Sequence, residues 1–188
     1  DQLANGSSLE DVLGPPDAEN RSDYFRMQQW ADNGRFGILV GSEHGEGDGY
    51  DGVRIENCLV YCNQEDGIKV GGTTARGGRN IIIRSCTSYS NKTMAGIWIQ
   101  SAQNGLIERC KSYNNWCYNI WVWNDINVTI RYCEVWRGIG PNLGGDEGGF
   151  DIDWSCHACT IVYCYSHHNN GMGFLLMGLG DGVYNGTP

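Results

Sequence analysis

Short apolar segments that alternate with polar residues recur along this chain, separated by turns rich in Gly and Asn. Each unit has a longer alternating segment followed by a short one, and this period-two alternation predicts β-strands rather than helices. The longer segments are VRIENCLVYCN (53–63), IIIRSCTSYSN (81–91), LIERCKSYNN (106–115), VTIRYCEVWRG (128–138) and TIVYCYSHHNN (160–170). The short segments are GILV (37–40), GIKV (67–70), GIWI (96–99), NIWV (119–122), GFDI (149–152) and GFLL (173–176).

The spacing of the short segments predicts how the strands are stacked. They start at residues 37, 67, 96, 119, 149 and 173, so that successive starts are 30, 29, 23, 30 and 24 residues apart. Irregular repeats of this length are typical of a parallel β-helix whose loops vary in length. We therefore predict an all-β fold, a single-stranded right-handed parallel β-helix (a solenoid) of about six coils. Residues 24–188 form this domain, either complete or as part of a longer β-helix, and residues 1–23 form a polar segment or partial coil.

Aligning the repeats predicts which side chains stack along the solenoid axis. We expect an isoleucine row and a cysteine row to point inwards, and an asparagine row to hydrogen-bond along the axis while adopting the left-handed backbone of a coil corner. An aromatic row continues through His167, and an inward Asn91 would be a poor glycan acceptor. The rows are Ile55, Ile83, Ile107, Ile130 and Ile161; Cys58, Cys86, Cys110, Cys133 and Cys164; Asn63, Asn91, Asn115 and Asn169; and Tyr61, Tyr89, Tyr113, Trp136 and His167.

The stacked cysteines are interpreted as small buried side chains with free thiols. The remaining four of the nine cysteines, Cys62, Cys117, Cys156 and Cys159, fall in turns. The segment Cys156-His-Ala-Cys159 has a spacing found in metal sites, but no second pair with zinc-site spacing accompanies it. A disulfide or free thiols are therefore favoured over zinc.

Alternation within the short segments places one set of side chains on the solvent face of a sheet. Trp98, Trp121 and Trp123 belong to this set, and Asp151 and Asp153 follow on the next coil. Indole rings on an exposed sheet are suited to stacking on sugar rings, so the three tryptophans are predicted to bind substrate. Cover of the same rings by loops or by a partner subunit is an equal alternative.

Asp151 and Asp153 are two residues apart, so both carboxylates project from one side of one strand. Such a pair can act as general acid and base on a glycosidic bond, which makes both residues predicted catalytic residues. Asp146, Glu147 and Asp151 can instead form a Ca²⁺ site of hard oxygen ligands, with Ca²⁺ as the candidate cofactor. A solvated acidic turn is the third alternative.

Composition narrows the choice of partners and compartment. A net charge of −9 argues against nucleic acid and favours a neutral glycan or a divalent cation. No apolar run approaches the length of a membrane span. An excess of Asn-x-Ser/Thr sequons favours a secreted, extracellular protein. A start at Asp1 without Met suggests a processed or excised product. The expected glycosylation sites are Asn5, Asn20, Asn127 and Asn185.

The repeat pattern over residues 24–177 resembles the pectin-lyase-like superfamily of parallel β-helices. The stretch GGFDIDWSCHACTIVYCYSHHNNGMGFLL (148–176) is similar to β-helix proteins grouped near glycoside hydrolases. The resemblance implies a polysaccharide hydrolase or lyase, but no catalytic residues carry over. The polygalacturonase set of paired Asp, His-Gly and Arg-Ile-Lys is missing. Lys69 lies too far from Asp151 to serve as a lyase base, and Arg137 is a nearer candidate.

Three functions remain open at this level. The protein is a secreted glycan-active enzyme, a non-catalytic glycan-binding or adhesive β-helix, or a structural subunit that self-associates end to end into an extracellular filament. The filament gains support because the sequence predicts no amphipathic capping helix, and an uncapped β-helix exposes strand edges that can pair with another copy.

Overall fold

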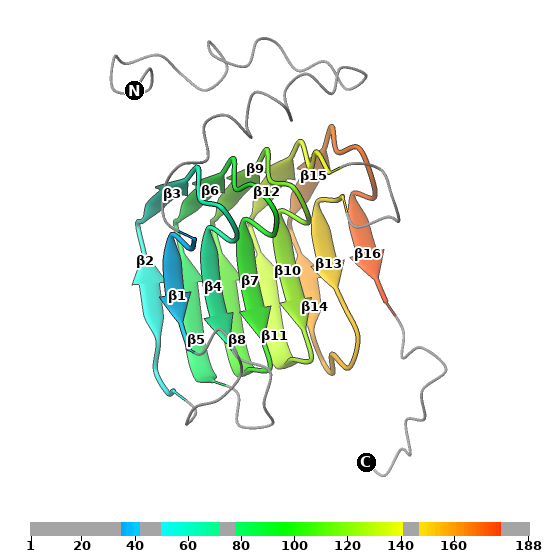
Figure 1. Ribbon diagram of the computed structural model, residues 1–188. Helices are drawn as coiled ribbons and strands as arrows, with labels where there is room; N and C mark the ends of the chain where they lie inside the picture. The colour runs from blue at the N-terminus through cyan, green and yellow to red at the C-terminus, as the bar shows by residue number, and fades with distance from the viewer. Residues whose placement is uncertain (1–34, 42–49, 72–77, 141–146, 178–188) are drawn as a thin grey trace.

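The computed structural model of the protein describes residues 35–41, 50–71, 78–140 and 147–177, which form three parallel sheets around one axis (Figure 1). Sheet A contains β1 (Ile38–Val40), β4 (Ile68–Gly71), β7 (Ile97–Gln100), β10 (Ile120–Trp123), β13 (Phe150–Ile152) and β16 (Phe174–Leu176). Sheet B contains β2 (Arg54–Glu56), β5 (Arg79–Arg84), β8 (Gln103–Glu108), β11 (Ile126–Arg131) and β14 (Thr160–Val162). Sheet C contains β3 (Leu59–Tyr61), β6 (Thr87–Tyr89), β9 (Lys111–Tyr113), β12 (Glu134–Trp136) and β15 (Tyr165–His167).

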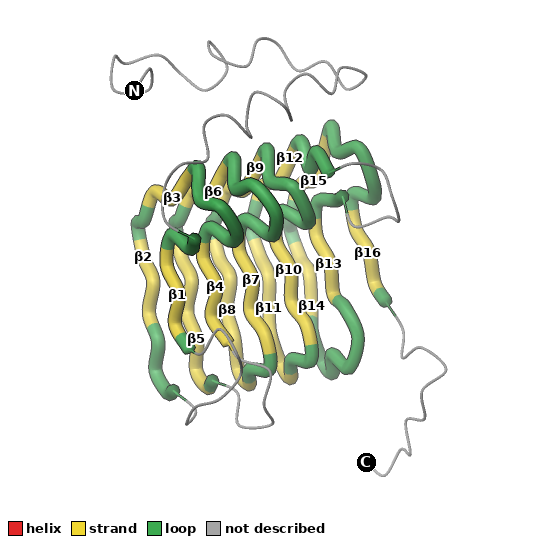
Figure 2. The backbone as a smooth tube through the Cα atoms, viewed as in Figure 1, coloured by secondary structure: helices red, strands yellow, loops and turns green. Residues whose placement is uncertain are grey.

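The chain visits the sheets in a constant order, as β5, β6 and β7 illustrate by lying in sheets B, C and A in turn. Each longer segment of the sequence therefore supplies two strands with a corner between them, and each short segment supplies one strand of sheet A. The strands of successive coils lie side by side, and the loops gather at the corners (Figure 2). All the described residues outside strands lie in turns or loops, and the predicted all-β parallel solenoid is confirmed.

The inward isoleucine and cysteine rows are confirmed. Ile83, Ile107 and Ile130 pair in register across sheet B and are each 0 % exposed. The cysteine row lies beside them with free thiols, and its central members are 1–2 % exposed. Because adjacent strands are about 4.8 Å apart, each side chain packs on the equivalent one in the next coil. Burying each isoleucine contributes about 2 kcal/mol to the stability of the fold, so each coil adds a similar amount.

The asparagine row is inward as predicted, but the prediction that it carries the left-handed backbone is wrong. The residue before each corner asparagine has the positive φ instead: Cys62, Ser90 and Asn114 have φ of 55°, 56° and 54°. The physical reason is that two adjacent residues serve different purposes at the corner. The first turns the chain from one sheet towards the next, and the second keeps an ordinary backbone conformation and points its amide into the interior.

The buried amides form a hydrogen-bonded ladder. The Asn63 amide donates to Asn91 Oδ1 at 2.9 Å, and the Asn91 amide donates to Asn115 Oδ1 at 2.8 Å. The row is interrupted at Gly138, where Asn119 takes over by accepting from Asn115 and donating to Asn169. The ladder therefore continues past Gly138 by way of Asn119, in the turn that precedes β10.

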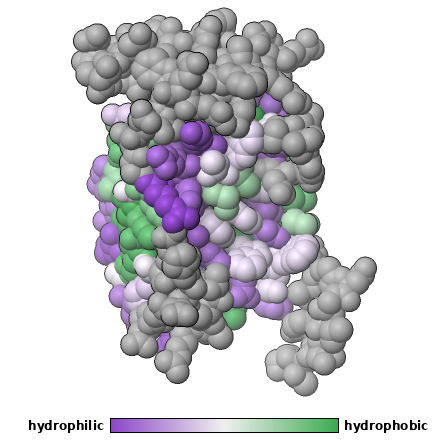
Figure 3. Space-filling model, viewed as in Figure 1, coloured by the Kyte–Doolittle hydropathy of each residue, from purple (hydrophilic) through white to green (hydrophobic). Residues whose placement is uncertain are grey.

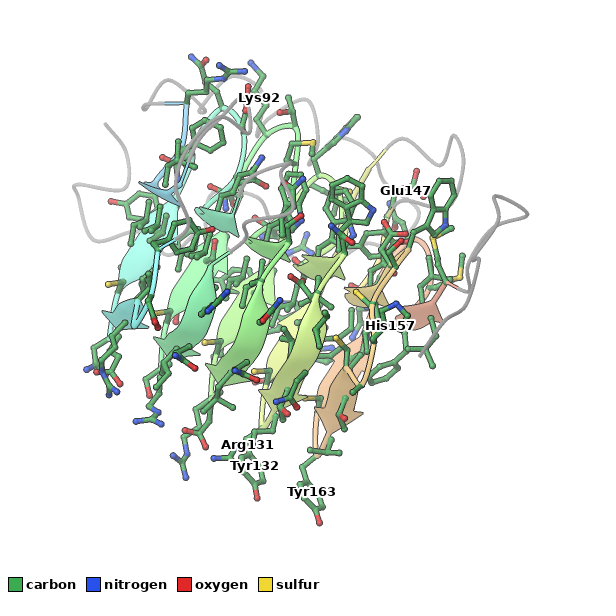
Figure 4. All side chains as sticks on the ribbon, turned by 90° about the horizontal axis from the view of Figure 1, so that it is seen from below. Lys92, Arg131, Tyr132, Glu147, His157 and Tyr163 are labelled. Atoms are coloured by element: carbon green, nitrogen blue, oxygen red, sulfur yellow. The ribbon has the colours of Figure 1, made fainter. Side chains whose placement is uncertain are left out.

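Two further ladders lie on the outside of the solenoid. On sheet C the predicted aromatic row is stacked, with ring centroids 4.2–5.6 Å apart from Tyr61 to His167. On sheet B the acidic and basic side chains alternate, and Glu108 bonds both Arg84 and Arg131 at 2.7 Å. Beyond this ladder, Tyr132 stacks on Tyr163 and both rings project away from the sheets (Figure 4).

Replacing Asn91 with Ala tests the amide ladder. The substitution removes the acceptor for both the backbone and the side-chain amide of Asn63, and the donor to Asn115, all of them buried. We expect the free energy of unfolding to fall by about 3 kcal/mol, measured by urea denaturation, because stranded buried groups cost more than exposed ones. Lys111→Ala is the control, since this side chain is 60 % exposed and its ion pair should contribute under about 0.5 kcal/mol. A loss for Asn91→Ala no larger than the control's would contradict the ladder's importance.

Candidate functional site

The outer face of sheet A brings together the residues predicted to bind sugar. Lys69, Trp98, Trp121 and Asp151 are direct neighbours in register on β4, β7, β10 and β13. Trp123 lies beside this row, opposite Gln100 on β7. The described residues visible on this side of the molecule range from hydrophilic to hydrophobic (Figure 3). The predicted stacking of successive coils therefore holds for this face.

The indole rings of Trp98 and Trp121 make contacts with other side chains of the protein. Their centroids are 4.4 Å apart with an interplanar angle of 9°, so the rings lie face to face. Lys69 Nζ lies 3.8 Å from the centroid of the Trp98 ring, a cation–π contact. Trp98 is only 7 % exposed as a result. A sugar arriving from solvent would therefore meet the edges of this stack rather than a free indole face.

The two carboxylates that were predicted to be catalytic differ in accessibility. Asp151 is 1 % exposed, whereas Asp153 is partly exposed. Asp153 Oδ2 accepts a hydrogen bond from Trp121 Nε1 at 3.0 Å, and Asp153 Oδ1 accepts one from the backbone amide of Trp154 at 2.6 Å. Asp153 is thus anchored by the indole stack while it keeps lone pairs for an outside donor.

Trp154 was missed by sequence reasoning and is the most exposed tryptophan of this face, at 51 %. It follows the end of β13, in a turn that runs beside the end of β10. Asn124 donates its backbone amide to the Trp154 carbonyl at 2.9 Å, and Asp153 donates its own to Val122 at 2.9 Å. The available signal was the run Asp153-Trp154, but strand alternation gives no direction for a side chain in a turn. Trp123, Asp153 and Trp154 form the accessible edge of this face, called the sheet A edge below.

The residues predicted to bind calcium are only partly within the described structure. Asp146 lies outside the described residues, and Glu147 and Asp151 are both buried. Within residues 35–41, 50–71, 78–140 and 147–177, no group of three or more His, Cys, Asp or Glu side chains could hold a metal ion. The described carboxylates alone therefore do not make up a calcium site, and the prediction depends on Asp146.

A buried acidic group lies at the other end of the indole stack. Asp66 is 1 % exposed, and its Oδ1 accepts the backbone amide of Ala95 at 2.9 Å. Burial raises the pKa of Asp66 to about 7, although the nearby positive charge of Lys69 opposes the shift. Burial in turn lowers the pKa of Lys69, with Asp66 opposing that change. Poor hydration therefore disfavours the charged forms of both Asp66 and Lys69, and their mutual attraction partly offsets this effect.

The glycosylation predictions fall on different parts of the chain. Asn127 is exposed, donates its amide to Asn104 Oδ1 at 2.8 Å and lines a groove of about 380 Å³ on the outside of sheet B. Asn91 is 0 % exposed, as expected for a poor acceptor. The remaining sites, Asn5, Asn20 and Asn185, lie outside the described residues.

Comparison with known proteins identifies the solenoid and nothing more specific. Residues 37–186 match the family described as the right handed beta helix region. Comparison with the curated proteins and with the solved structures gave no match. In the part of the chain that the structure describes, we find no helix of the length and apolar character that crossing a membrane requires.

Asp66→Asn tests the buried acidic group. In the folded protein the pKa of Asp66 is about 7, above its ordinary value of 3.8. The folded state therefore binds the Asp66 proton more tightly than the unfolded state does. Protonation of Asp66 stabilises the fold fully below about pH 4, and this stabilisation is lost as the pH rises to about 7. The loss amounts to a few kcal/mol. We expect Asp66→Asn, which keeps an acceptor for Ala95, to flatten the fall in Tm between pH 4 and 7.

The matched control is Asp51→Asn, because Asp51 is exposed and bonds the Asn80 amide at 2.7 Å. Its Tm should follow that of the unaltered protein across the same pH range. An unaltered pH profile for Asp66→Asn would show that the Asp66 carboxyl does not hold a proton in the folded state.

Proposed function

Because the chain belongs to the right-handed β-helix family, in which stacked coils build long flat faces, we propose that it is a secreted protein that binds a neutral polysaccharide along sheet A. The single observation that carries the proposal is the sheet A edge. There Asp153, anchored by Trp121, precedes the half-exposed Trp154 in the chain, and its backbone bonds Val122, the residue before the partly exposed Trp123. Aromatic platforms beside a carboxylate acceptor suit a sugar, which has apolar ring faces and hydroxyl donors.

The protein's charge bears on the class of polysaccharide. The chain carries a net charge of −9, and the acceptor at the edge is a carboxylate. Acidic polymers such as polygalacturonate would be repelled, whereas neutral glucans, xylans or mannans would not. The excess of sequons supports secretion, which would place the protein where such polymers occur.

Binding is better supported than hydrolysis or elimination. A general acid and base must both reach the scissile bond within hydrogen-bonding distance. Asp153 is partly exposed at the sheet A edge, but Asp151, although in register with Trp121 on the same face, is 1 % exposed. The anchored Asp153 is better suited to receive a sugar hydroxyl than to share catalysis with a buried partner.

Trp154→Ala and Trp123→Ala test the binding edge. Each substitution should weaken affinity for a neutral polysaccharide about tenfold, because one stacking contact contributes about 1.4 kcal/mol. Calorimetry against a panel of soluble glucans, xylans, mannans and polygalacturonate measures the effect. Tyr165→Ala is the control, because Tyr165 is 61 % exposed but lies on sheet C.

Two outcomes would overturn this proposal. Equal losses for Tyr165→Ala and Trp154→Ala would remove the sheet A edge as the binding surface. Release of reducing ends or unsaturated products by the unaltered protein, abolished by Asp153→Asn, would replace simple binding with catalysis.

A second candidate function is end-to-end self-association, and the last described coil favours it. Phe174 and Leu176 pair with Phe150 and Ile152, and so continue the inward rows of sheet A. They are nevertheless 49 % and 70 % exposed. Inward side chains left accessible at one end, beside strands with free edges, suit the docking of another copy in the same orientation.

Leu176→Lys tests self-association. Sedimentation velocity and negative-stain microscopy of the full chain should show assemblies that grow with concentration, and the substitution should reduce them. Ile126→Lys, a 44 % exposed position in the middle of the stack, should leave assembly unchanged. Single rods at all concentrations of the unaltered protein would exclude a filament.

A further inference from the structure

The turn between β13 and β14 carries two cysteines, Cys156 and Cys159, on a rigid support. His157 between them bridges to the preceding coil: its amide donates to Asp125 at 2.8 Å, and its carbonyl accepts from Asn127 at 2.9 Å. Ala158 has a φ of 53°, which turns the chain sharply before Cys159. The backbone of this short segment is therefore held in place on both sides of the bridge. His157 lies well away from Tyr132 and Tyr163 (Figure 4).

The two thiols are neighbours. Each affects the ionisation of the other, and each reaches a carbonyl of the preceding coil: Cys156 bonds Val122 at 3.6 Å and Cys159 bonds Asp125 at 3.5 Å. Sulfur atoms within hydrogen-bonding reach of one another need only a small rotation to form a bond. Two cysteines separated by two residues in a turn are also the arrangement used by dithiol redox sites.

Accessibility separates this pair from the central cysteines of the inward row, although Cys58 and Cys164 at the ends of that row are partly exposed as well. Cys156 and Cys159 are both partly exposed, whereas Cys86, Cys110 and Cys133 are only 1–2 % exposed. The turn is therefore partly accessible from solution in the folded solenoid, and both side chains pack against the core. The core thiols would need local unfolding to react.

Cys159 is the better nucleophile of the two. The hydrogen bond from the Cys156 thiol lowers the pKa of Cys159 to about 7, despite the opposing effect of burial. The same hydrogen bond raises the pKa of Cys156, and burial adds to the increase. One thiolate beside one thiol is the state from which thiol–disulfide exchange begins.

A metal site is a weaker explanation of the same segment. Structural zinc requires four ligands, and the described residues contain no group of three or more His, Cys, Asp or Glu side chains able to hold a metal. Disulfide formation is therefore the better-supported chemistry for Cys156 and Cys159.

We propose that Cys156 and Cys159 form a reversible disulfide, which makes this turn a dithiol site for low-molecular-weight disulfides such as oxidised glutathione. The site is independent of glycan binding. It nevertheless lies close to the sheet A edge, since the Cys156 amide donates to the Asp153 carbonyl at 3.3 Å.

The exchange proceeds in two steps. The Cys159 thiolate attacks one sulfur of the small disulfide, whose S–S bond breaks as a mixed disulfide forms and a small thiolate leaves. Cys156 then loses its proton to the departing small thiolate, which becomes a thiol, and the Cys156 thiolate attacks Cys159 Sγ, so that the second small thiolate leaves. The mixed disulfide breaks, and the protein disulfide forms. A thiol, a thiolate and a small disulfide thus become a protein disulfide, a small thiol and a small thiolate, with two electrons passed to the small molecule.

The test is oxidation of the reduced, folded full chain in buffers of graded reduced and oxidised glutathione. Free thiols are then alkylated and peptides are mapped by mass spectrometry. We expect the Cys156–Cys159 disulfide to form first and to reverse in reduced glutathione. The core cysteines should stay reduced and therefore be found alkylated. In Cys156→Ser the resolving thiol is absent, so the glutathione adduct on Cys159 should rise by about tenfold.

Cys164→Ser is the matched control. Cys164 is also partly buried, and the hydrogen bond from Cys133 lowers its pKa to about 7, yet its neighbour Cys133 is 2 % exposed. Its removal should leave the Cys156–Cys159 disulfide unchanged. Formation of a Cys133–Cys164 disulfide first, or oxidation of Cys156 and Cys159 only in denaturant, would overturn the proposal. The mapping of the unaltered protein decides this even where a variant fails to fold.

Discussion

The register between successive coils is the constraint on which this structure depends. Parallel strands separated by about 4.8 Å place each residue directly over its equivalent in the next coil. Every property of a position is therefore repeated along the axis. A side chain that packs well packs on its own kind, and an unsatisfied group would be multiplied by the number of coils.

The chain meets this constraint by stacking side chains that can bond to copies of themselves. Isoleucines fill the interior, and amides such as Asn91 both donate and accept along the wall. Aromatic rings stack on sheet C, and opposite charges alternate on sheet B, since like charges at this spacing would repel. Where the repeat fails at Gly138, Asn119 enters the amide ladder from the turn before β10. The ladder tolerates an irregular coil because an amide can accept from one neighbour and donate to another.

The same stacking limits where a ligand can bind. Face-to-face packing of Trp98 and Trp121 stabilises the sheet, but it removes the indole faces that a sugar would need. On this face, the accessible aromatic surface shifts to the sheet A edge, where the coils end in turns and Trp154 lies beside Asn124 of the preceding coil. The turns are also where Cys156 and Cys159 escape the burial imposed on the core cysteines. In these examples, side chains able to bind a ligand or react are more accessible in the turns than on the sheets.

The sequence by itself determined the parallel solenoid, the inward rows and the shared face of Trp98, Trp121, Trp123 and Asp151. Period-two alternation and the repeat spacing specify these because they depend only on which residues are stacked. The tertiary structure alone decided that Asp151 is buried, that the indole faces are occupied and that Cys62 rather than Asn63 takes the left-handed corner. It also decided the exposure of Trp154. These features depend on side-chain contacts between coils and on the path of the turns, neither of which a repeat pattern encodes.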